Sequence, residues 1–100
     1  MKLSVRFTPE AAAWLSGLRD RIARKKVLAR IASIEEDGHL GDWKSVGDTV
    51  AELRIHSGPG YRIYFTRRGD TLIIILLGGD KSDQARDIIM AKALAARLDI

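Results

Sequence analysis

The polar side chains of greatest chemical interest lie in two consecutive segments, residues 50–56 and 61–67, in which polar and apolar residues alternate. Alternation with a period of two is typical of a β-strand that buries one face. The apolar positions then predict a side facing the core, and the polar positions share the opposite, exposed side. The residues expected on that polar side are Glu52, Arg54 and His56 in the first segment and Arg62, Tyr64 and Thr66 in the second.

Such a face would gather a carboxylate, an imidazole, a phenol and two guanidinium groups, which are the groups that metal-independent RNA cleavage needs. A base takes the proton from a ribose 2′-hydroxyl, which attacks the adjacent phosphate, and an acid protonates the departing 5′-oxygen. Arginine suits the phosphate because its planar fork matches two phosphate oxygens. The alternative is that Glu52 only forms cross-strand ion pairs with Arg54 or Arg62, as charged residues on exposed sheet faces commonly do.

The two segments can share this face only if the turn between them has a suitable length. Facing residues of an antiparallel pair lie on the same side, so the numbers of paired residues must add to an even value. A five-residue loop that pairs His56 with Arg62 meets this condition and places Arg54 opposite Tyr64. We therefore expect Tyr61 to belong to the loop or to a bulge.

The composition limits the kinds of protein that this chain can be. Its 100 residues are 46% hydrophobic and 30% charged, which is typical of one globular domain. Cysteine is absent and only two histidines are present, so disulfides are excluded and we expect chemistry without a metal ion or other cofactor. No run of about 18 apolar residues is present, and the N-terminal segment does not resemble a secretory signal. We therefore expect a cytoplasmic protein that does not bind membranes.

The 17 Lys and Arg residues outnumber the 13 Asp and Glu residues, and the basic excess is concentrated in two places. Residues 53–69 contain four arginines and no acid. Residues 19–30 contain one acid and six basic residues, which are Arg19, Arg21, Arg24, Lys25, Lys26 and Arg30. Basic patches of this kind indicate binding to a polyanion such as nucleic acid. For residues 19–30 the alternative is a solvated helix face.

The helices expected before these strands have clear boundaries. Residues 3–7 alternate like a strand, and Thr8-Pro9-Glu10 then predicts a helix start with Thr8 as N-cap. We expect this helix to break near residues 19–20 and a second helix to end at Gly38. The buried face of the second helix is predicted to be formed by Ala23, Val27, Ile31 and Ile34.

The rest of the chain predicts a loop, three strands and a helix. Residues 38–48 contain three glycines and are expected to be a loop, followed by the two strands described above. The continuous apolar run 71–77 predicts a strand covered on both faces, stopped by Gly78-Gly79. Ser82 is expected to cap a final helix whose apolar stripe is Ile88, Ala91, Ala95 and Leu98. The predicted fold is α+β, with the order β-α-α-β-β-β-α and a small, mostly antiparallel sheet.

Several segments of the chain carry a likeness that extends over nearly its whole length, in order and in spacing. They are Asp42-Trp43-Lys44-Ser45-Val46-Gly47, Glu52-Leu53-Arg54-Ile55, Gly58-Pro59-Gly60-Tyr61-Arg62-Ile63-Tyr64-Phe65, and Gly78-Gly79-Asp80-Lys81 with the following Gln84 and Asp87-Ile88. Together they resemble the HigB-type branch of the RelE/ParE superfamily, the toxin halves of bacterial type II toxin–antitoxin modules.

The resemblance implies a small sheet flanked by helices that acts as an mRNA endoribonuclease on translating ribosomes. Position by position, Arg54 and Arg62 match the basic strand residues that hold the scissile phosphate, and Lys81 matches a basic residue after the last core strand. Glu52, His56 and Tyr64 are inferred from geometry, because acid–base residues vary within this superfamily. Some members carry a catalytic His or Tyr near the C-terminus, and Leu98-Asp99-Ile100 offers neither, so the general acid stays open.

The resemblance also implies partners. One is a cognate antitoxin, often a helix-turn-helix protein of the HigA type, which we expect to dock beside the 71–77 strand and to block Arg54 and Arg62. The other is the ribosome: the basic residues of segment 19–30, together with Lys44, are expected to contact its RNA backbone, because the segment lacks interleaved aromatic residues.

Two alternatives from other functional classes share the expected fold, which by itself does not decide between them. One is a ParE-like inhibitor that binds DNA gyrase without cutting RNA, and the other is an RNA-binding relative without catalysis. The cluster of Arg54, Arg62 and Tyr64 favours the nuclease, because a protein-binding inhibitor does not need a phosphate site.

Overall fold

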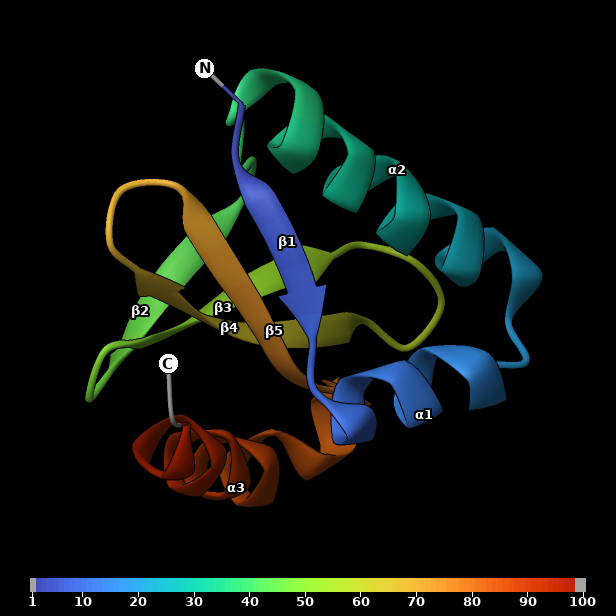
Figure 1. Cartoon of the computed structure of the whole chain (residues 1–100). Coiled ribbons are helices and arrows are strands. Elements are labelled where there is room, and N and C mark those ends of the chain that lie inside the picture. Colours follow the sequence, from blue (N-terminus) through green and yellow to red (C-terminus); the bar gives the residue numbers. More distant parts are fainter. Residues whose placement is uncertain (1, 99–100) are drawn as a thin grey trace.

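A computed structural model describes residues 2–98, which form a five-stranded sheet with helices on both of its faces (Figure 1). In chain order the elements are β1 (Ser4–Phe7), α1 (Pro9–Gly17), α2 (Arg21–Asp37), β2 (Trp43–Gly47), β3 (Val50–Ile55), β4 (Tyr61–Arg68), β5 (Leu72–Asp80), the 3₁₀ turn η1 (Lys81–Asp83) and α3 (Gln84–Arg97). The strand order is β1-β5-β4-β3-β2, with β1 parallel to β5 and the other neighbours antiparallel. The predicted α+β class and mostly antiparallel sheet are confirmed. No helix within residues 2–98 is long and apolar enough to cross a membrane.

The helix boundaries follow from local hydrogen bonding. The Thr8 side chain accepts a hydrogen bond from the Ala11 backbone N–H, and the Asp20 side chain does the same for Ala23, so each caps the first turn of its helix. The second helix ends at Gly38, whose φ of 68° is the left-handed conformation that favours glycine. The predicted buried face of α2 is confirmed at all four positions.

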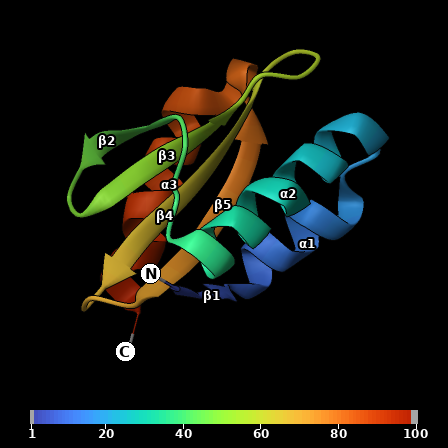
Figure 2. The same cartoon turned by 90° about the horizontal axis from the view of Figure 1, so that it is seen from above.

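Two apolar clusters hold the layers together, one on each face of the sheet. Helices α1 and α2 cover one face, where Ile73 and Ile75 of β5 are buried, and α3 covers the other, where Ile74 and Leu76 are buried (Figure 2). The prediction that this strand is covered on both faces is therefore confirmed. Leu77, near its end, is only partly covered.

Residues 43–47 form a strand, so the prediction of a loop over 38–48 is wrong there. Strand β2 lies at the sheet edge and pairs with β3, with Trp43 opposite Leu53 and Lys44 opposite Glu52. Its side chains are mostly exposed, so no burial pattern marks it in the sequence. Backbone hydrogen bonds to β3, and the edge-on packing of the Trp43 ring against Phe65, place it instead.

The apolar run also continues further than predicted. Strand β5 passes through Gly78 and Gly79 to Asp80 instead of stopping at the glycines. A Cβ on Gly78 would overlap the Trp14 ring, and a Cβ on Gly79 would overlap the Asp87 carboxylate. The two glycines therefore let both helical layers approach the strand closely; they do not end it.

The start of the final helix differs from the prediction as well. Ser82 is not its N-cap: the Asp80 side chain accepts the hydrogen bond of the Ser82 N–H, at 2.9 Å, and caps the η1 turn. Helix α3 then begins at Gln84. Its predicted apolar stripe packs against the sheet as expected, with Ala91 and Ala95 buried. The last three positions contain neither His nor Tyr, and positions 99 and 100 lie outside the described residues.

Candidate active site

The candidate residues lie on the antiparallel pair β3 and β4. The facing pairs are Ile55 with Tyr61, Arg54 with Arg62, and Glu52 with Tyr64. These pairs confirm that the polar residues of both strands share one face. The predicted register is wrong: Arg54 faces Arg62 instead of Tyr64, and the last pair before the loop is Ile55 with Tyr61 instead of His56 with Arg62. Tyr61 is therefore the first residue of β4 and does not belong to the loop or to a bulge. The loop has the predicted length of five residues, 56–60.

Contacts on the other face of the sheet explain why Tyr61 belongs to the strand. Its ring packs edge-on against Trp14, with 6.4 Å between ring centroids, and its hydroxyl donates to Asp20 Oδ2 at 3.3 Å. The loop itself turns with positive φ at Gly58 and Gly60, 52° and 86°. Glycine adopts these angles without strain, so the reversal is complete before Tyr61.

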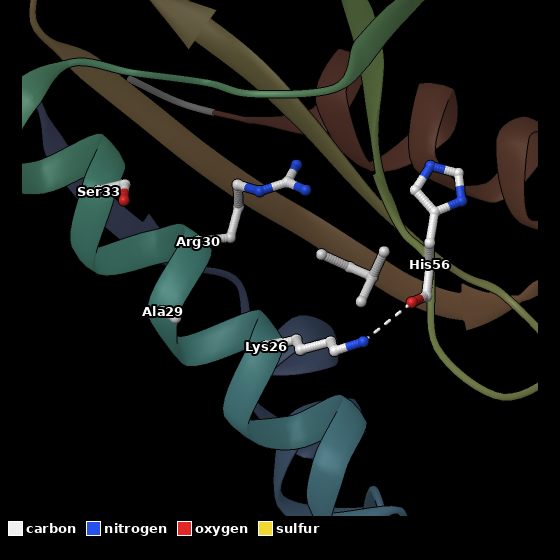
Figure 3. A pocket seen from close by; sticks show the side chains of 6 residues that line it. Lys26, Ala29, Arg30, Ser33 and His56 are labelled. Carbon is white, nitrogen blue, oxygen red and sulfur yellow. Dashed lines mark hydrogen bonds between the residues drawn. The ribbon is translucent and has the colours of Figure 1, made fainter.

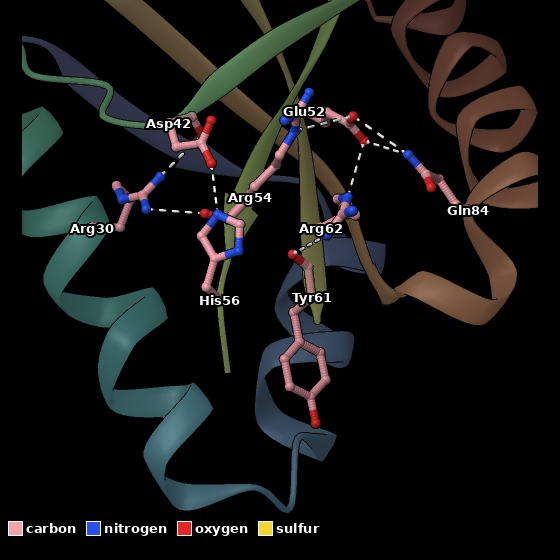
Figure 4. A network of polar contacts seen from close by, with 8 residues as sticks. All are labelled: Arg30, Asp42, Glu52, Arg54, His56, Tyr61, Arg62 and Gln84. Carbon is pink, nitrogen blue, oxygen red and sulfur yellow. Dashed lines mark hydrogen bonds and ion pairs between the residues drawn. The ribbon is translucent and has the colours of Figure 1, made fainter. Parts of the chain in front are cut away.

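The carboxylate of Glu52 lies between the two arginines (Figure 4). Its Oε1 is 3.7 Å from Arg54 Nε and its Oε2 is 3.6 Å from Arg62 Nε. From α3, Gln84 Nε2 donates to the same two oxygens, at 3.4 and 3.0 Å. Glu52 is only 3% exposed, so the expectation that it lies on an exposed face is wrong. It forms ion pairs with both arginines, as in the alternative interpretation, although only the pair with Arg62 crosses between strands.

Both guanidinium groups extend from this buried carboxylate toward the surface. The side chain of Arg54 is 31% exposed and that of Arg62 is 14% exposed. Their Nε atoms are buried and have no hydrogen-bond partner among the described residues. The arginines are thus held by charge near Glu52 while their buried Nε donors have no acceptor, which is uncommon in native structures.

Tyr64 is fully buried, with 0% exposure, under the α3 layer. The expectation that it lies on an exposed face is therefore wrong. Burial raises the pKa of its hydroxyl, and the nearby charges of Glu52 and Asp87 raise it further. The hydroxyl has no hydrogen-bond partner among residues 2–98. Tyr64 is thus a neutral phenol behind the two arginines.

His56 follows β3 and lies at the surface with Asp42. Its Nε2 is 2.7 Å from Asp42 Oδ2, and this hydrogen bond is the main cause of a lowered pKa at Asp42, with the nearby Arg54 charge also contributing. The Arg54 backbone N–H donates to the Asp42 carbonyl at 3.0 Å. Asp42, the residue before β2, is therefore held beside β3 at this edge of the sheet.

A hollow of about 400 Å³ opens at this end of the sheet. It is lined by the 56–60 loop together with Arg62 and Lys81. The Lys81 N–H donates to the Gly60 carbonyl at 2.9 Å, which places the first residue of η1 against the loop. The structure therefore brings Lys81, Arg62 and His56 to one hollow, with Arg54 on the same face of the sheet.

The basic residues of segment 19–30 differ in their contacts. Lys26 Nζ donates to the His56 carbonyl at 3.0 Å, and Arg30 donates to the carbonyl of Arg54, also at 3.0 Å, so these two reach the candidate site. The other four, Arg19, Arg21, Arg24 and Lys25, are exposed along or just before α2. Lys44 is exposed on β2 opposite Glu52, on the face that carries the arginines.

Two residues that contact the site were not predicted from the sequence. Asp42 lies in the segment expected to be a loop, and only the pairing of β2 with β3 brings it to His56. Gln84 lies on α3, thirty-two positions from Glu52 in the chain, and nothing in its local sequence indicates that contact. Both residues belong to the segments that carry the family likeness.

The arrangement can bind an anion and move a proton. Arginine and lysine at one hollow attract a phosphate group, and arginine offers it paired donors. Because Asp42 accepts the hydrogen bond from His56 Nε2 when the ring is neutral, Nδ1 is then the free nitrogen that can take up a proton. These are the groups needed for phosphoryl chemistry on a phosphodiester.

Comparisons with known proteins agree with this fold. Residues 13–96 match the family model described as phage-derived, Gp49-like protein. An uncharacterized protein of Haemophilus influenzae is 43% identical over 100 residues, which cover the whole of both chains. Among solved structures, a double arginine-to-alanine mutant of the E. coli toxin RelE in the free state gives a TM-score of 0.73 at 16% identity, covering 98% of this chain and all of that one. At that identity the structural likeness shows a shared fold, so the expected RelE-like fold is confirmed and the HigB-type assignment stays a prediction.

Proposed function

The chain belongs to the phage-derived Gp49-like family, and from that premise and the geometry of its site we propose that it is the toxin of a type II toxin–antitoxin module. Its activity in this proposal is that of the HigB-type branch: a metal-independent endoribonuclease that cuts mRNA on ribosomes and stops translation. The RelE-like fold supports the superfamily, and the site residues support the chemistry.

The observation that carries the proposal is the facing pair Arg54 and Arg62 with one carboxylate between them. Like charges placed directly opposite each other in a sheet destabilise it, and among the described residues Glu52 is the one carboxylate within 4 Å of either arginine. The remaining positive charge lies beside a hollow that Lys81 also lines. A phosphodiester carries one negative charge and would complete the balance, which a purely structural ion-pair cluster would not require.

The roles of the residues follow from their positions. Arg62 and Lys81 hold the scissile phosphate in the hollow, and Arg54 adds positive charge on the same face. Nδ1 of His56 takes the proton from the ribose 2′-hydroxyl, with Asp42 orienting the ring. The 2′-oxygen then bonds to phosphorus, the bond to the 5′-oxygen breaks, and that oxygen takes a proton from solvent water as it leaves. The products are a 2′,3′-cyclic phosphate and a 5′-hydroxyl.

Glu52, Gln84 and Tyr64 have supporting roles in this proposal. Both oxygens of Glu52 already contact Arg54, Arg62 or Gln84, so its carboxylate positions the arginines and does not transfer the substrate proton. Tyr64 lies behind them, away from the hollow, and fills the core under α3.

Two partners complete the proposed function. The exposed basic residues of α2 and Lys44 on β2 would meet ribosomal RNA through its backbone. A cognate antitoxin, of the HigA helix-turn-helix type in this proposal, would neutralise the toxin by covering the end of the sheet where Arg54 and Arg62 lie. Four apolar side chains exposed on the two long helices offer contact area to a protein partner; they are Ile22 and Leu28 on α2 and Ile89 and Met90 on α3.

The experiment is to add the purified protein to a reconstituted translation reaction and to a DNA gyrase supercoiling reaction. We expect the mRNA to be cut at discrete positions within the translated region, and supercoiling to be unaffected. Inhibition of gyrase with intact mRNA would support the ParE-like alternative. RNA binding without either effect would support the non-catalytic relative, and both outcomes would contradict the proposal.

A further inference from the structure

A second hollow adjoins the first at His56 (Figure 3). It lies between α2 and the end of β3 and has a volume of about 390 Å³, near the lower end of the ~300–1,000 Å³ typical of ligand sites. The residues that line it are Lys26, Ala29, Arg30, Ser33, Ile55 and His56. His56 lines both hollows, so the two lie next to each other at the end of the sheet.

The cationic wall of this second hollow is fixed by hydrogen bonds to the backbone. Lys26 Nζ donates to the His56 carbonyl at 3.0 Å. Arg30 is bound more extensively: its Nη2 donates to the Arg54 carbonyl at 3.0 Å, and its Nη1 to those of Leu40 and Asp42 at 3.3 and 3.4 Å. An ammonium group has three N–H donors, so Lys26 keeps donors for a ligand while its position is already set.

The remaining lining differs from that of a simple phosphate site. Ala29 contributes exposed apolar surface beside the buried side chain of Ile55, and Ser33 adds a partly exposed hydroxyl. A bare anion gains nothing from apolar surface, whereas a nucleotide presents a flat base or ribose as well as a phosphate. The combination of cation, hydroxyl and apolar floor therefore fits one nucleotide unit better than a free phosphate.

We propose that this second hollow binds the nucleotide adjacent to the scissile phosphate, with Lys26 holding its phosphate and Ala29 contacting its sugar or base. The proposal rests on the proposed function for the nature of the substrate. An RNA strand whose phosphate lies by Arg62 and Lys81 reaches the second hollow by crossing His56. Lys26 and Arg30 are thereby assigned to the substrate and separated from the residues that would meet the ribosome.

The chain offers a matched control on the same helix. Lys25 is the neighbour of Lys26 in sequence and is equally basic, but it faces another part of the α2 surface, next to Ile22 and Leu28. Removal of either lysine changes the net charge by the same amount. A difference between the two variants therefore reports the second hollow and not general electrostatic attraction.

The experiment measures binding of a trinucleotide with 2′-O-methyl riboses, which lacks the attacking hydroxyl, by amide chemical shifts and fluorescence anisotropy. We expect shifts both in residues 56–62 and 81 and in residues 26–33. Lys26→Ala should weaken binding about tenfold through loss of a charge-assisted hydrogen bond, and Lys25→Ala by about twofold or less. Ala29→Leu, which adds bulk at an exposed helix position that leucine suits, should weaken binding as Lys26→Ala does.

Three outcomes separate this inference from the proposed function. Shifts in both hollows with the expected difference between Lys26→Ala and Lys25→Ala support it. Shifts confined to residues 56–62 and 81, or equal effects of the two lysine variants, overturn the second nucleotide site while leaving the proposed function in place. Binding at neither hollow overturns both.

Discussion

Arg54 and Arg62 lie directly opposite each other on β3 and β4, and the buried carboxylate of Glu52 lies within 3.7 Å of the Nε of both. Two guanidinium groups therefore share one buried carboxylate at the edge of a surface hollow. Neither Nε has a hydrogen-bond partner among the described residues. Such an arrangement costs stability, and an anionic substrate would recover part of that cost when it binds.

The first prediction concerns Arg62→Ala. Loss of a guanidinium that stabilises the phosphate in the transition state should lower the rate of RNA cleavage by about 10²–10³-fold. Because Glu52 is buried and loses one of its two positive partners, the free energy of unfolding should also fall, by about 1–3 kcal/mol. Cleavage assays and urea unfolding measure the two effects.

The double variant Arg62→Ala with Glu52→Gln is the control for that stability loss. It removes the carboxylate that would be left underpaired, so most of the lost stability should return while cleavage stays low. If cleavage returns together with stability, Arg62 acts only on folding and its proposed contact with the phosphate is wrong.

The second prediction separates the two roles considered for Tyr64. Its hydroxyl is buried and unpartnered, so Tyr64→Phe should increase the free energy of unfolding by about 1 kcal/mol, since a desolvated group is removed and no hydrogen bond is lost. Cleavage should stay within about threefold of the unmodified protein, which is about 0.7 kcal/mol in activation free energy. A loss of cleavage in a folded Tyr64→Phe variant would restore the catalytic role expected from the sequence.

The third prediction is a pH dependence of stability that comes from Asp87. Burial raises the pKa of this carboxyl above the ordinary value for aspartate, and the Arg86 charge opposes the shift only in part. A raised pKa in the folded state means that folding favours the protonated acid, so this contribution is full below the unfolded pKa and is lost as pH rises through the folded one. At pH 7 the buried carboxylate is charged and destabilising.

Asp87→Asn should accordingly raise the melting temperature at pH 7. The gain should shrink toward zero as the pH falls below about 3, where Asp87 is protonated in both the folded and the unfolded state. Thermal unfolding followed by circular dichroism across this range measures the difference. A gain that stays constant with pH would show that the effect comes from packing against Gly79 and not from charge.

The fourth prediction tests the close approach of α1 to β5. Gly78→Ala would place a Cβ inside the Trp14 ring, so it should lower the free energy of unfolding by about 1–3 kcal/mol through overpacking. Gly17→Ala is the matched control, because a Cβ there meets nothing within 4 Å at the last residue of α1. Alanine at position 17 should be neutral or stabilising by up to about 1 kcal/mol, and equal losses at both positions would contradict this account of the two glycines.

The sequence predicts much of the fold because burial imposes regular patterns on it. The helical spacing of the α2 core residues and the Thr8 cap have local causes, and the structure confirms them. The alternation in β3 and β4 likewise predicts which side chains share a face. The alternation does not show that α3 covers part of that face. This cover is the reason why Glu52 and Tyr64 are buried although they alternate with core residues.

The features that were missed depend on contacts between distant segments. β2 is an exposed edge strand without a hydrophobic pattern, so its pairing with β3, and with it the contact of Asp42 with His56, leaves no local signal. The register of β3 and β4 is set by Tyr61, which is held by Trp14 and Asp20 on the far side of the sheet. Charge and spacing in the strand segments alone are consistent with either register.

The most direct measurement is the chemistry of the RNA ends produced by the purified protein on mRNA in a translation reaction. The account predicts a 2′,3′-cyclic phosphate on the upstream fragment and a 5′-hydroxyl on the downstream one, because the 2′-oxygen is the nucleophile and His56 takes its proton. The same mRNA with a 2′-deoxyribose at the cleavage position should stay intact there, and so should unmodified mRNA treated with the Arg54→Ala, Arg62→Ala double variant. Fragments that carry 3′-hydroxyl and 5′-phosphate ends, or cleavage that persists at the deoxyribose position or with the double variant, would contradict it.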